Sequence, residues 1–212
     1  MRPVTVAIVA VEDFSPFHFS VPCIMFSEKA AAKKRFEVQV CAEPPGVVTS
    51  REGFSVTAPQ GLEAVTVADI VIVPWWGTPS LRPPQSLLDA LVQARQNGAQ
   101  VVGLCLGAFV LGYAGLLDGR RAATHWEFEA DFQARFPDAH LDINALYVDD
   151  DGIITSAGTA AALDCCLYHP PTVWQHGSES DCAPDDCAAA SRGRSGAVYC
   201  PAGGEKYAGS TD

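Results

Sequence analysis

The residues best placed to do chemistry lie in the run Gly103-Leu104-Cys105-Leu106-Gly107. A β-branched apolar stretch ends just before the cysteine, and an apolar helical pattern follows it directly. This succession predicts a strand, a sharp turn and a helix, with Cys105 at the apex of a nucleophile elbow. The two glycines would let neighbouring backbone pass close to the turn. A helix N-terminus beside the sulfur would lower the thiol pKa and offer a donor to an oxyanion, although a cysteine packed as a small hydrophobe is the alternative.

The composition is that of one globular domain followed by a tail of different character. The chain has 212 residues, of which 48% are hydrophobic and 18% charged, and its formal net charge is −11 at pH 7. That charge opposes contact with a nucleic-acid backbone, so we expect no DNA binding by this chain. No apolar run is long enough to span a bilayer, and residues 1–6 lead straight into a strand pattern. We therefore expect a cytoplasmic protein without a signal peptide and without membrane contact.

Strand and helix patterns alternate along the first 168 residues. Buried strands are predicted at residues 5–10, 37–42, 69–73 and 100–104, with helices at 16–34, 86–97 and 107–114. Apolar strands separated by helices predict an α/β fold, a flavodoxin-like three-layer sandwich with a parallel sheet covered on both faces. Ligands bind at the carboxyl ends of the strands in such folds, and Cys105 follows one of those ends.

A hairpin and a last helix complete the predicted domain. Residues 145–148 and 153–156 flank Asp149-Asp150-Asp151-Gly152, and residues 158–168 have a helical pattern. The aspartates lack the alternating oxygen ligands of a calcium loop, so a hairpin turn explains them better than a metal site. Five cysteines in apolar elements are expected to be reduced thiols, namely Cys23, Cys41, Cys105, Cys165 and Cys166.

Several blocks of sequence carry a resemblance to a known family. They are residues 104–111 around the cysteine, 114–122, Thr124-His125-Trp126, 146–149 and 155–161, with weaker matches in 6–26 and 69–97. Together they resemble the ThiJ/PfpI superfamily, which has the class I glutamine amidotransferase-like fold, and most closely the version fused to AraC-type transcriptional regulators. The resemblance implies a domain at residues 1–168, with Cys105 as the elbow residue and His125 across the pocket.

Three departures from the family pattern fall in the implied site. His18 stands where enzymes of the superfamily carry an acid, and a neutral imidazole supplies neither an acidic proton nor a fixed negative charge. Pro74 is followed by two tryptophans, where relatives commonly have a glycine whose N–H helps to form an oxyanion hole. Peptidase-like members also place a histidine directly after the cysteine. We therefore expect a weakly catalytic or purely ligand-binding pocket, in which the catalytic candidates are Cys105 and His125 and the lining residues are His18, Trp75, Trp76, Gly77, Leu106 and Trp126.

Two functions fit these residues. The first is the ligand-sensing and dimerisation domain of an AraC-type regulator, which binds an unidentified small-molecule effector as a homodimer. The second is a cysteine-dependent enzyme resembling an isonitrile hydratase or a glyoxalase. Neither function calls for a metal or a cofactor. Simpler roles stay open, since His125 can be a structural hydrogen-bonding group, Trp75 and Trp76 can cap a pocket or a dimer contact, and His18 can face solvent.

The tail after Tyr168 reads differently from the domain. Apolar periodicity stops there, and Cys182, Cys187 and Cys200 lack the paired spacing of a zinc site. We expect residues 169–212 to be irregular or disordered. Regulators of the resembling kind continue with a basic segment and a helix-turn-helix, and codons allowed for the tail, read one base later, encode a similar segment. We therefore expect that a frameshift near Tyr168 truncates the chain before a DNA-binding domain.

Overall fold

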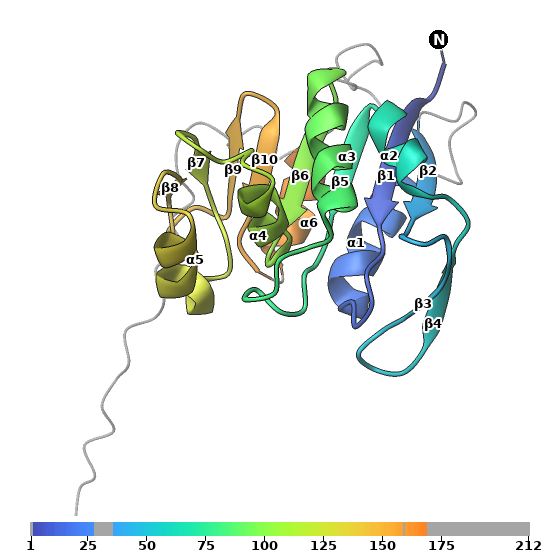
Figure 1. The fold of residues 1–212 in the computed structure, drawn as a ribbon, viewed down its shortest axis with the longest axis horizontal. Helices are drawn as coiled ribbons and strands as arrows, with labels where there is room; N and C mark the ends of the chain where they lie inside the picture. Colours follow the sequence, from blue (N-terminus) through green and yellow to red (C-terminus); the bar gives the residue numbers. More distant parts are fainter. Residues whose placement is uncertain (1, 28–35, 159, 169–212) are drawn as a thin grey trace, which may run out of the picture.

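The computed structural model describes residues 2–27, 36–158 and 160–168 (Figure 1). Strands and helices alternate over most of this length, as the sequence predicts. The main elements in chain order are β1 (Val4–Val9), α1 (Pro16–Phe26), β2 (Phe36–Cys41), β3 (Gly46–Thr49), β4 (Ser55–Ala58), α2 (Leu62–Val67), β5 (Ile70–Val73), α3 (Gln85–Gln96), β6 (Gln100–Leu104), α4 (Gly107–Tyr113), β7 (Arg121–Ala122), α5 (Glu129–Arg135), β8 (His140–Leu141), β9 (Tyr147–Asp150), β10 (Ile153–Ser156) and α6 (Ala161–Tyr168).

The central sheet has the strand order β2-β1-β5-β6-β10-β9. The first five strands run parallel, and β9 returns antiparallel to β10. The four strands predicted to form a parallel sheet are therefore neighbours in it, and β6 lies inside the sheet rather than at an edge. This order brings the carboxyl ends of β1, β5 and β6 to one edge of the sheet.

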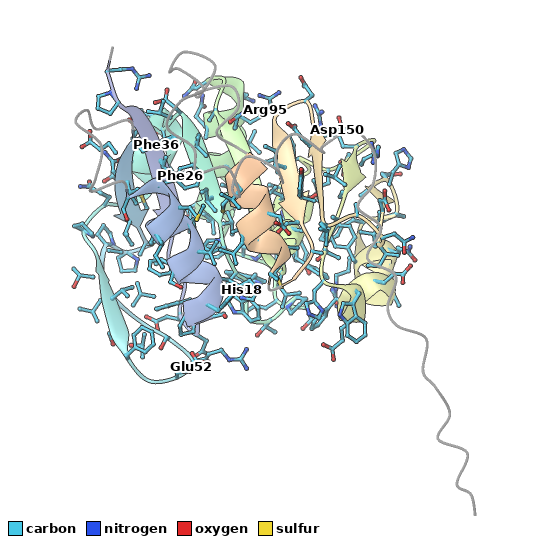
Figure 2. All side chains as sticks on the ribbon, turned by 180° about the vertical axis from the view of Figure 1, so that it is seen from behind. His18, Phe26, Phe36, Glu52, Arg95 and Asp150 are labelled. Atoms are coloured by element: carbon cyan, nitrogen blue, oxygen red, sulfur yellow. The ribbon has the colours of Figure 1, made fainter. Side chains whose placement is uncertain are left out.

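Helices cover both faces of the sheet. In Figure 1, α2, α3 and α4 lie in front of the strands, and in Figure 2, seen from behind, α1 and α6 come forward. Side chains alternate accordingly along β1, because Ala7 and Val9 pack with the α3–α4 core whereas Val6 and Ile8 pack with the α1–α6 core. The predicted three-layer, flavodoxin-like sandwich is confirmed.

The cysteines outside the elbow behave as small hydrophobes. Cys41, Cys165 and Cys166 are buried in the two cores. Burial raises the pKa of the Cys41 thiol to about 11 and that of Cys166 to about 12. These thiols are therefore protonated at neutral pH, in agreement with the expectation of reduced, packed cysteines.

Two predicted boundaries are wrong. The first helix ends at Phe26 instead of residue 34, because Ser27 leaves helical geometry with φ −93° and ψ 66°. The hairpin strand is β9, two residues later than predicted, because Asp151 and Gly152 form the two-residue loop with φ 53° and 73°. Asp150 therefore belongs to the strand, where Arg120 pairs with it at 3.3 Å.

The elements that sequence reasoning missed are short and lie at the margins of the sheet. The β3–β4 hairpin is antiparallel, and it extends beyond the carboxyl end of β1 and β2 (Figure 1). Only one face of the hairpin is buried, since Val48 is 4% exposed and Val47 is 68% exposed. Two backbone hydrogen bonds join the hairpin to the β1–α1 loop. The N–H of Asp13 donates to the carbonyl of Thr49 at 2.9 Å, and the N–H of Arg51 donates to the carbonyl of Phe14 at 3.2 Å.

Residues 169–212 lie outside the described part of the chain, so the expected tail and its three cysteines remain predictions. None of the helices in the described ranges is long and apolar enough to cross a membrane.

The start of α4 lies directly against the end of β5, and this contact gives a first prediction. A Cβ built on Gly107 would overlap the carbonyl oxygen of Val73, which is backbone and cannot move aside. We expect Gly107→Ala to lower the free energy of unfolding by about 3 kcal/mol in urea denaturation, the upper range for overpacking. Gly53→Ala is the control, because its Cβ meets no atom within 4 Å and only its φ of 86° is unfavourable.

Gly53→Ala should lower the free energy of unfolding by about 1 kcal/mol, because the left-handed conformation is unfavourable for a residue with a side chain. Equal losses in the two variants would show that α4 can move away from β5.

Candidate functional site

Cys105 occupies the turn between β6 and α4 and is held there by its backbone. Its φ is 53°, a left-handed conformation that is uncommon for a residue with a side chain. Its N–H donates to the carbonyl of Ser156 at 3.1 Å, and its carbonyl accepts from the hydroxyl of Thr124 at 3.0 Å. The residue is only 1% exposed. The strained elbow that the sequence predicts is therefore present, and its thiol is buried.

The flanking glycines make this turn possible. A Cβ on Gly103 would come within 2.9 Å of the backbone nitrogen of Ala108 in the first turn of α4. Together with the contact of Gly107 on Val73, this close approach fixes α4 against both β5 and β6. The left-handed residue costs of order 1–3 kcal/mol, which the surrounding packing and hydrogen bonds must offset.

His125 directly follows Thr124, whose hydroxyl donates to the carbonyl of Cys105 in the elbow. Its Nδ1 accepts from the N–H of Glu127 at 3.3 Å, so in the neutral ring the proton is on Nε2. The ring packs closely on Gly158, where an added Cβ would overlap His125 Cδ2. Its other face stacks on Trp126 with the centroids 5.5 Å apart. Trp126 is 70% exposed, so it forms an outer wall of this site.

His18 enters from the first turn of α1. It is 7% exposed, so the solvent-facing alternative is wrong. Ser15, which precedes the helix, places its hydroxyl 2.9 Å from Nδ1 of His18. Burial, and to a smaller extent the positive charge that His125 can carry, lowers the pKa of His18 to about 4. The two imidazoles are therefore near enough to interact electrostatically, and His18 is neutral at pH 7.

The end of the molecule at which His18 lies is visible in Figure 2. His18 and Glu52, which belongs to the turn between β3 and β4, are labelled at one end, whereas Arg95 and Asp150 are labelled at the other. His18 thus lies at the carboxyl edge of the parallel strands, the edge that also carries the elbow.

The residues after Pro74 make different contacts. The ring of Trp75 lies 5.1 Å from that of His18, and the guanidinium carbon of Arg51 lies 5.7 Å from the Trp75 centroid. Trp75 Nε1 is buried without a hydrogen-bond partner among the described residues, and exposed Gly77 lies beside it. Trp76 instead donates to the carbonyl of Leu81 at 2.8 Å and lines a different cavity.

Leu106, another predicted lining residue, is buried like its neighbour Cys105. It is 3% exposed and belongs to the core beneath α3 and α4. The structure therefore brings His18 to Trp75, His125 to Trp126 and Thr124 to Cys105. The common pocket of all eight predicted residues remains a prediction.

Sequence reasoning missed three residues that support the site. Ser15 stands three positions before His18, the spacing of a capping box, so this pair was recognisable. Thr124 lies in the Thr-His-Trp block but was given no role. The contact between Arg51 and Trp75 could not be predicted from the sequence, because it depends on where the β3–β4 hairpin packs.

The arrangement favours hydrogen bonding over strong acid–base catalysis. Neutral His18 and the Nε2–H tautomer of His125 can exchange hydrogen bonds with a polar ligand, and Trp75 and Trp126 supply apolar walls. Among the described residues there is no cluster of three or more His, Cys, Asp or Glu side chains that could hold a metal ion.

The buried His18 makes stability depend on pH. Its pKa falls from 6.5 to about 4 on folding, so the unfolded chain takes up this proton at a higher pH than the folded chain does. The neutral His18 side chain therefore contributes about 3 kcal/mol to the free energy of unfolding. This contribution is fully present above pH 6.5 and is lost as the pH falls toward 4. Urea unfolding between these limits should show this loss in the wild type and much less of it in His18→Asn.

His140→Asn is the matched control, because His140 is exposed on β8. If the free energy of unfolding of His18→Asn and of His140→Asn fell with pH as steeply as that of the wild type, the burial of an uncharged His18 would be contradicted.

The chain is similar in sequence to regulators and to an enzyme. The chain is 36% identical over 126 residues to the HTH-type transcriptional regulator CdhR of Pseudomonas aeruginosa, an alignment that covers 58% of this chain and 36% of CdhR. It is 31% identical over 121 residues to an isonitrile hydratase of Pseudomonas putida, covering 57% of this chain and 52% of that enzyme. The chain thus spans only about a third of the length of the regulator.

The fold has solved counterparts. A crystal structure of an AraC family transcriptional regulator from Pseudomonas putida superposes with a TM-score of 0.69 at 23% identity, covering 84% of this chain and 94% of that chain. The sequence profile of the DJ-1/PfpI family matches residues 4–168, the whole of the described sandwich. The chain therefore belongs to the DJ-1/PfpI family.

Proposed function

We propose that residues 4–168 form the effector-sensing domain of an AraC-type transcriptional regulator, and that the Cys105 site binds a small molecule without turning it over. The observation that carries this proposal is the buried, neutral His18 at the position where the enzymes use an acid. At pH 7 it presents an imidazole rather than a carboxyl group to the site. Such a group can orient a polar ligand but cannot provide a fixed negative charge.

Similarity to regulators supports the same conclusion. The chain is similar in sequence to CdhR, and the sandwich of this chain resembles that of an AraC family regulator. A sensing domain also needs a way to pass on its state, and we include homodimerisation in the proposal. Phe17 and Ile24 on α1 are 43% and 69% exposed, which gives this helix apolar surface for a partner copy. The net charge of −11 repels DNA phosphates, so the proposal does not include direct DNA binding by this chain.

The alternative is a cysteine-dependent enzyme, and one observation favours it. Cys105 keeps the left-handed elbow conformation, which costs energy and is typical of a nucleophile. The isonitrile hydratase of Pseudomonas putida is among the relatives. The two functions differ in whether the thiol reacts during turnover.

Turnover and binding assays with purified protein separate them. We expect no consumption of cyclohexyl isocyanide or methylglyoxal above the level of Cys105→Ser, and we expect at least one compound of a polar metabolite library to raise the melting temperature of the wild type. Turnover that disappears in Cys105→Ser would establish the enzyme and overturn the sensing proposal.

Restoring an acid to α1 tests the role of His18 directly. In His18→Glu, a carboxylate would stabilise a His125 imidazolium and, through it, a Cys105 thiolate. We expect the rate of Cys105 oxidation by hydrogen peroxide to rise by about tenfold, the effect of one unit of thiol pKa. Mass spectrometry of the Cys105 peptide separates this thiol from the others.

Ser27→Glu is the matched control, since it adds the same charge at an exposed residue at the end of α1, away from His18. Unchanged Cys105 oxidation in a folded His18→Glu variant, or an equal rise in Ser27→Glu, would show that His18 does not act on the thiol.

A further inference from the structure

A cavity that Cys105 does not line lies on the α2–α3 side of the sheet. Its volume is about 470 Å³, within the range of small-molecule sites. The wall is mainly apolar, and Val9, Leu62 and Leu87 contribute to it from β1, α2 and α3. It opens at the carboxyl ends of β1 and β2, the edge at which parallel α/β sheets bind ligands. Neither Cys105 nor a histidine lines it.

Two carboxylates line this cavity because of strand register. β1 and β2 pair in parallel with Val9 opposite Cys41, so the segments that follow them leave the sheet at the same edge. Glu12 follows β1 by three residues and Glu43 follows β2 by two, and both reach the cavity.

The hydrogen bonds of the two carboxylates orient them without neutralising them. Glu12 accepts from the backbone N–H of Thr49 at 3.1 Å, and Glu43 accepts from the hydroxyl of Ser86 at 2.5 Å. Within the described ranges neither forms an ion pair, and no lysine or arginine lines the cavity. Arg82 is close in sequence to the lining residue Pro84, but its guanidinium lies 5.6 Å from the Tyr113 ring centroid and donates to Gln85.

An aromatic wall accompanies these charges. Trp76 lines the cavity, and the hydrogen bond from its Nε1 to the carbonyl of Leu81 holds the ring in place. The indole face is the most favourable side-chain surface for a cation, and the gain grows where water is excluded. Carboxylates, an indole and an apolar wall therefore occur together in one concave site.

We propose that this cavity is a second binding site and that it takes an amphipathic organic cation, an ammonium or guanidinium group on an apolar body. The positive group lies between the Glu12 and Glu43 carboxylates and the Trp76 ring, and the apolar body fills the space against Leu62 and Leu87. An anion of the same shape is repelled by both carboxylates and by the net negative charge of the chain. The site is independent of the thiol pocket and of the function proposed for it.

Calorimetric titration with three probes of one chain length tests the charge preference. The probes are n-hexylammonium, hexan-1-ol and hexanoate, at low ionic strength. We expect hexylammonium to bind about tenfold more tightly than hexanol, and hexanoate not to bind, because charge is the only large difference between them. Added salt should weaken the binding of the ammonium probe but not that of the alcohol.

Conservative variants locate the bound probe. Glu12→Gln and Glu43→Gln keep an acceptor oxygen for Thr49 and Ser86 while removing the charge, and each should weaken hexylammonium binding by about fivefold. Trp76→Leu keeps an apolar wall, so it should weaken the ammonium probe and leave hexanol unaffected. Glu37→Gln on the exposed side of β2 is the control for the loss of one charge and should bind like the wild type.

Three results would overturn the proposal. They are equal affinity for hexylammonium and hexanol, no binding of hexylammonium, and unchanged binding in the double Glu12→Gln, Glu43→Gln variant. Loss of hexylammonium binding in Cys105→Ser with retention in that double variant would place the cation in the thiol pocket and would equally reject this cavity. None of these results bears on turnover at Cys105, so the proposed sensing function is tested separately.

Discussion

The structure depends on one close approach, between the first turn of α4 and the end of β5. Gly107 lies so near the carbonyl oxygen of Val73 that no side chain fits between them. Because α4 cannot retreat, the chain between β6 and α4 must turn within two residues, and Cys105 takes a left-handed conformation to do so. The same approach places Trp75, which follows β5, beside the elbow. Packing of backbone on backbone thus determines where the thiol and its aromatic neighbour lie.

Around this fixed turn, the charge state of the site is set by burial. His18 is neutral at pH 7 because α1 carries it under the surface, and Ser15 provides a local hydrogen bond. His125 is oriented by a backbone donor and by packing on Gly158. The family fold is thus retained with a buried, neutral imidazole at position 18, and the function proposed for the site depends on that group.

The other end of the sheet is organised by charge pairs, and it contrasts with the carboxyl edge. Arg95 pairs with Asp151 at 3.0 Å and Arg120 pairs with Asp150 at 3.3 Å, so two of the three hairpin aspartates are matched by arginines. Such partly exposed pairs contribute little to stability. At the carboxyl edge, Glu12 and Glu43 line a cavity to which no lysine or arginine of the described residues contributes. The distribution of unmatched charge therefore points to the carboxyl edge as the binding edge.

The sequence by itself determined the alternation of strands and helices, the parallel sheet and the elbow at Cys105, because apolar periodicity and glycine spacing are local properties of the chain. The resemblance to the ThiJ/PfpI superfamily, rather than a local pattern, pointed to His18, His125 and Trp75. Only the tertiary structure decided that Arg51 reaches Trp75, and that Glu12, Glu43 and Trp76 line one cavity. These relations join residues far apart in the chain, and they depend on strand order and register, which sequence periodicity does not encode.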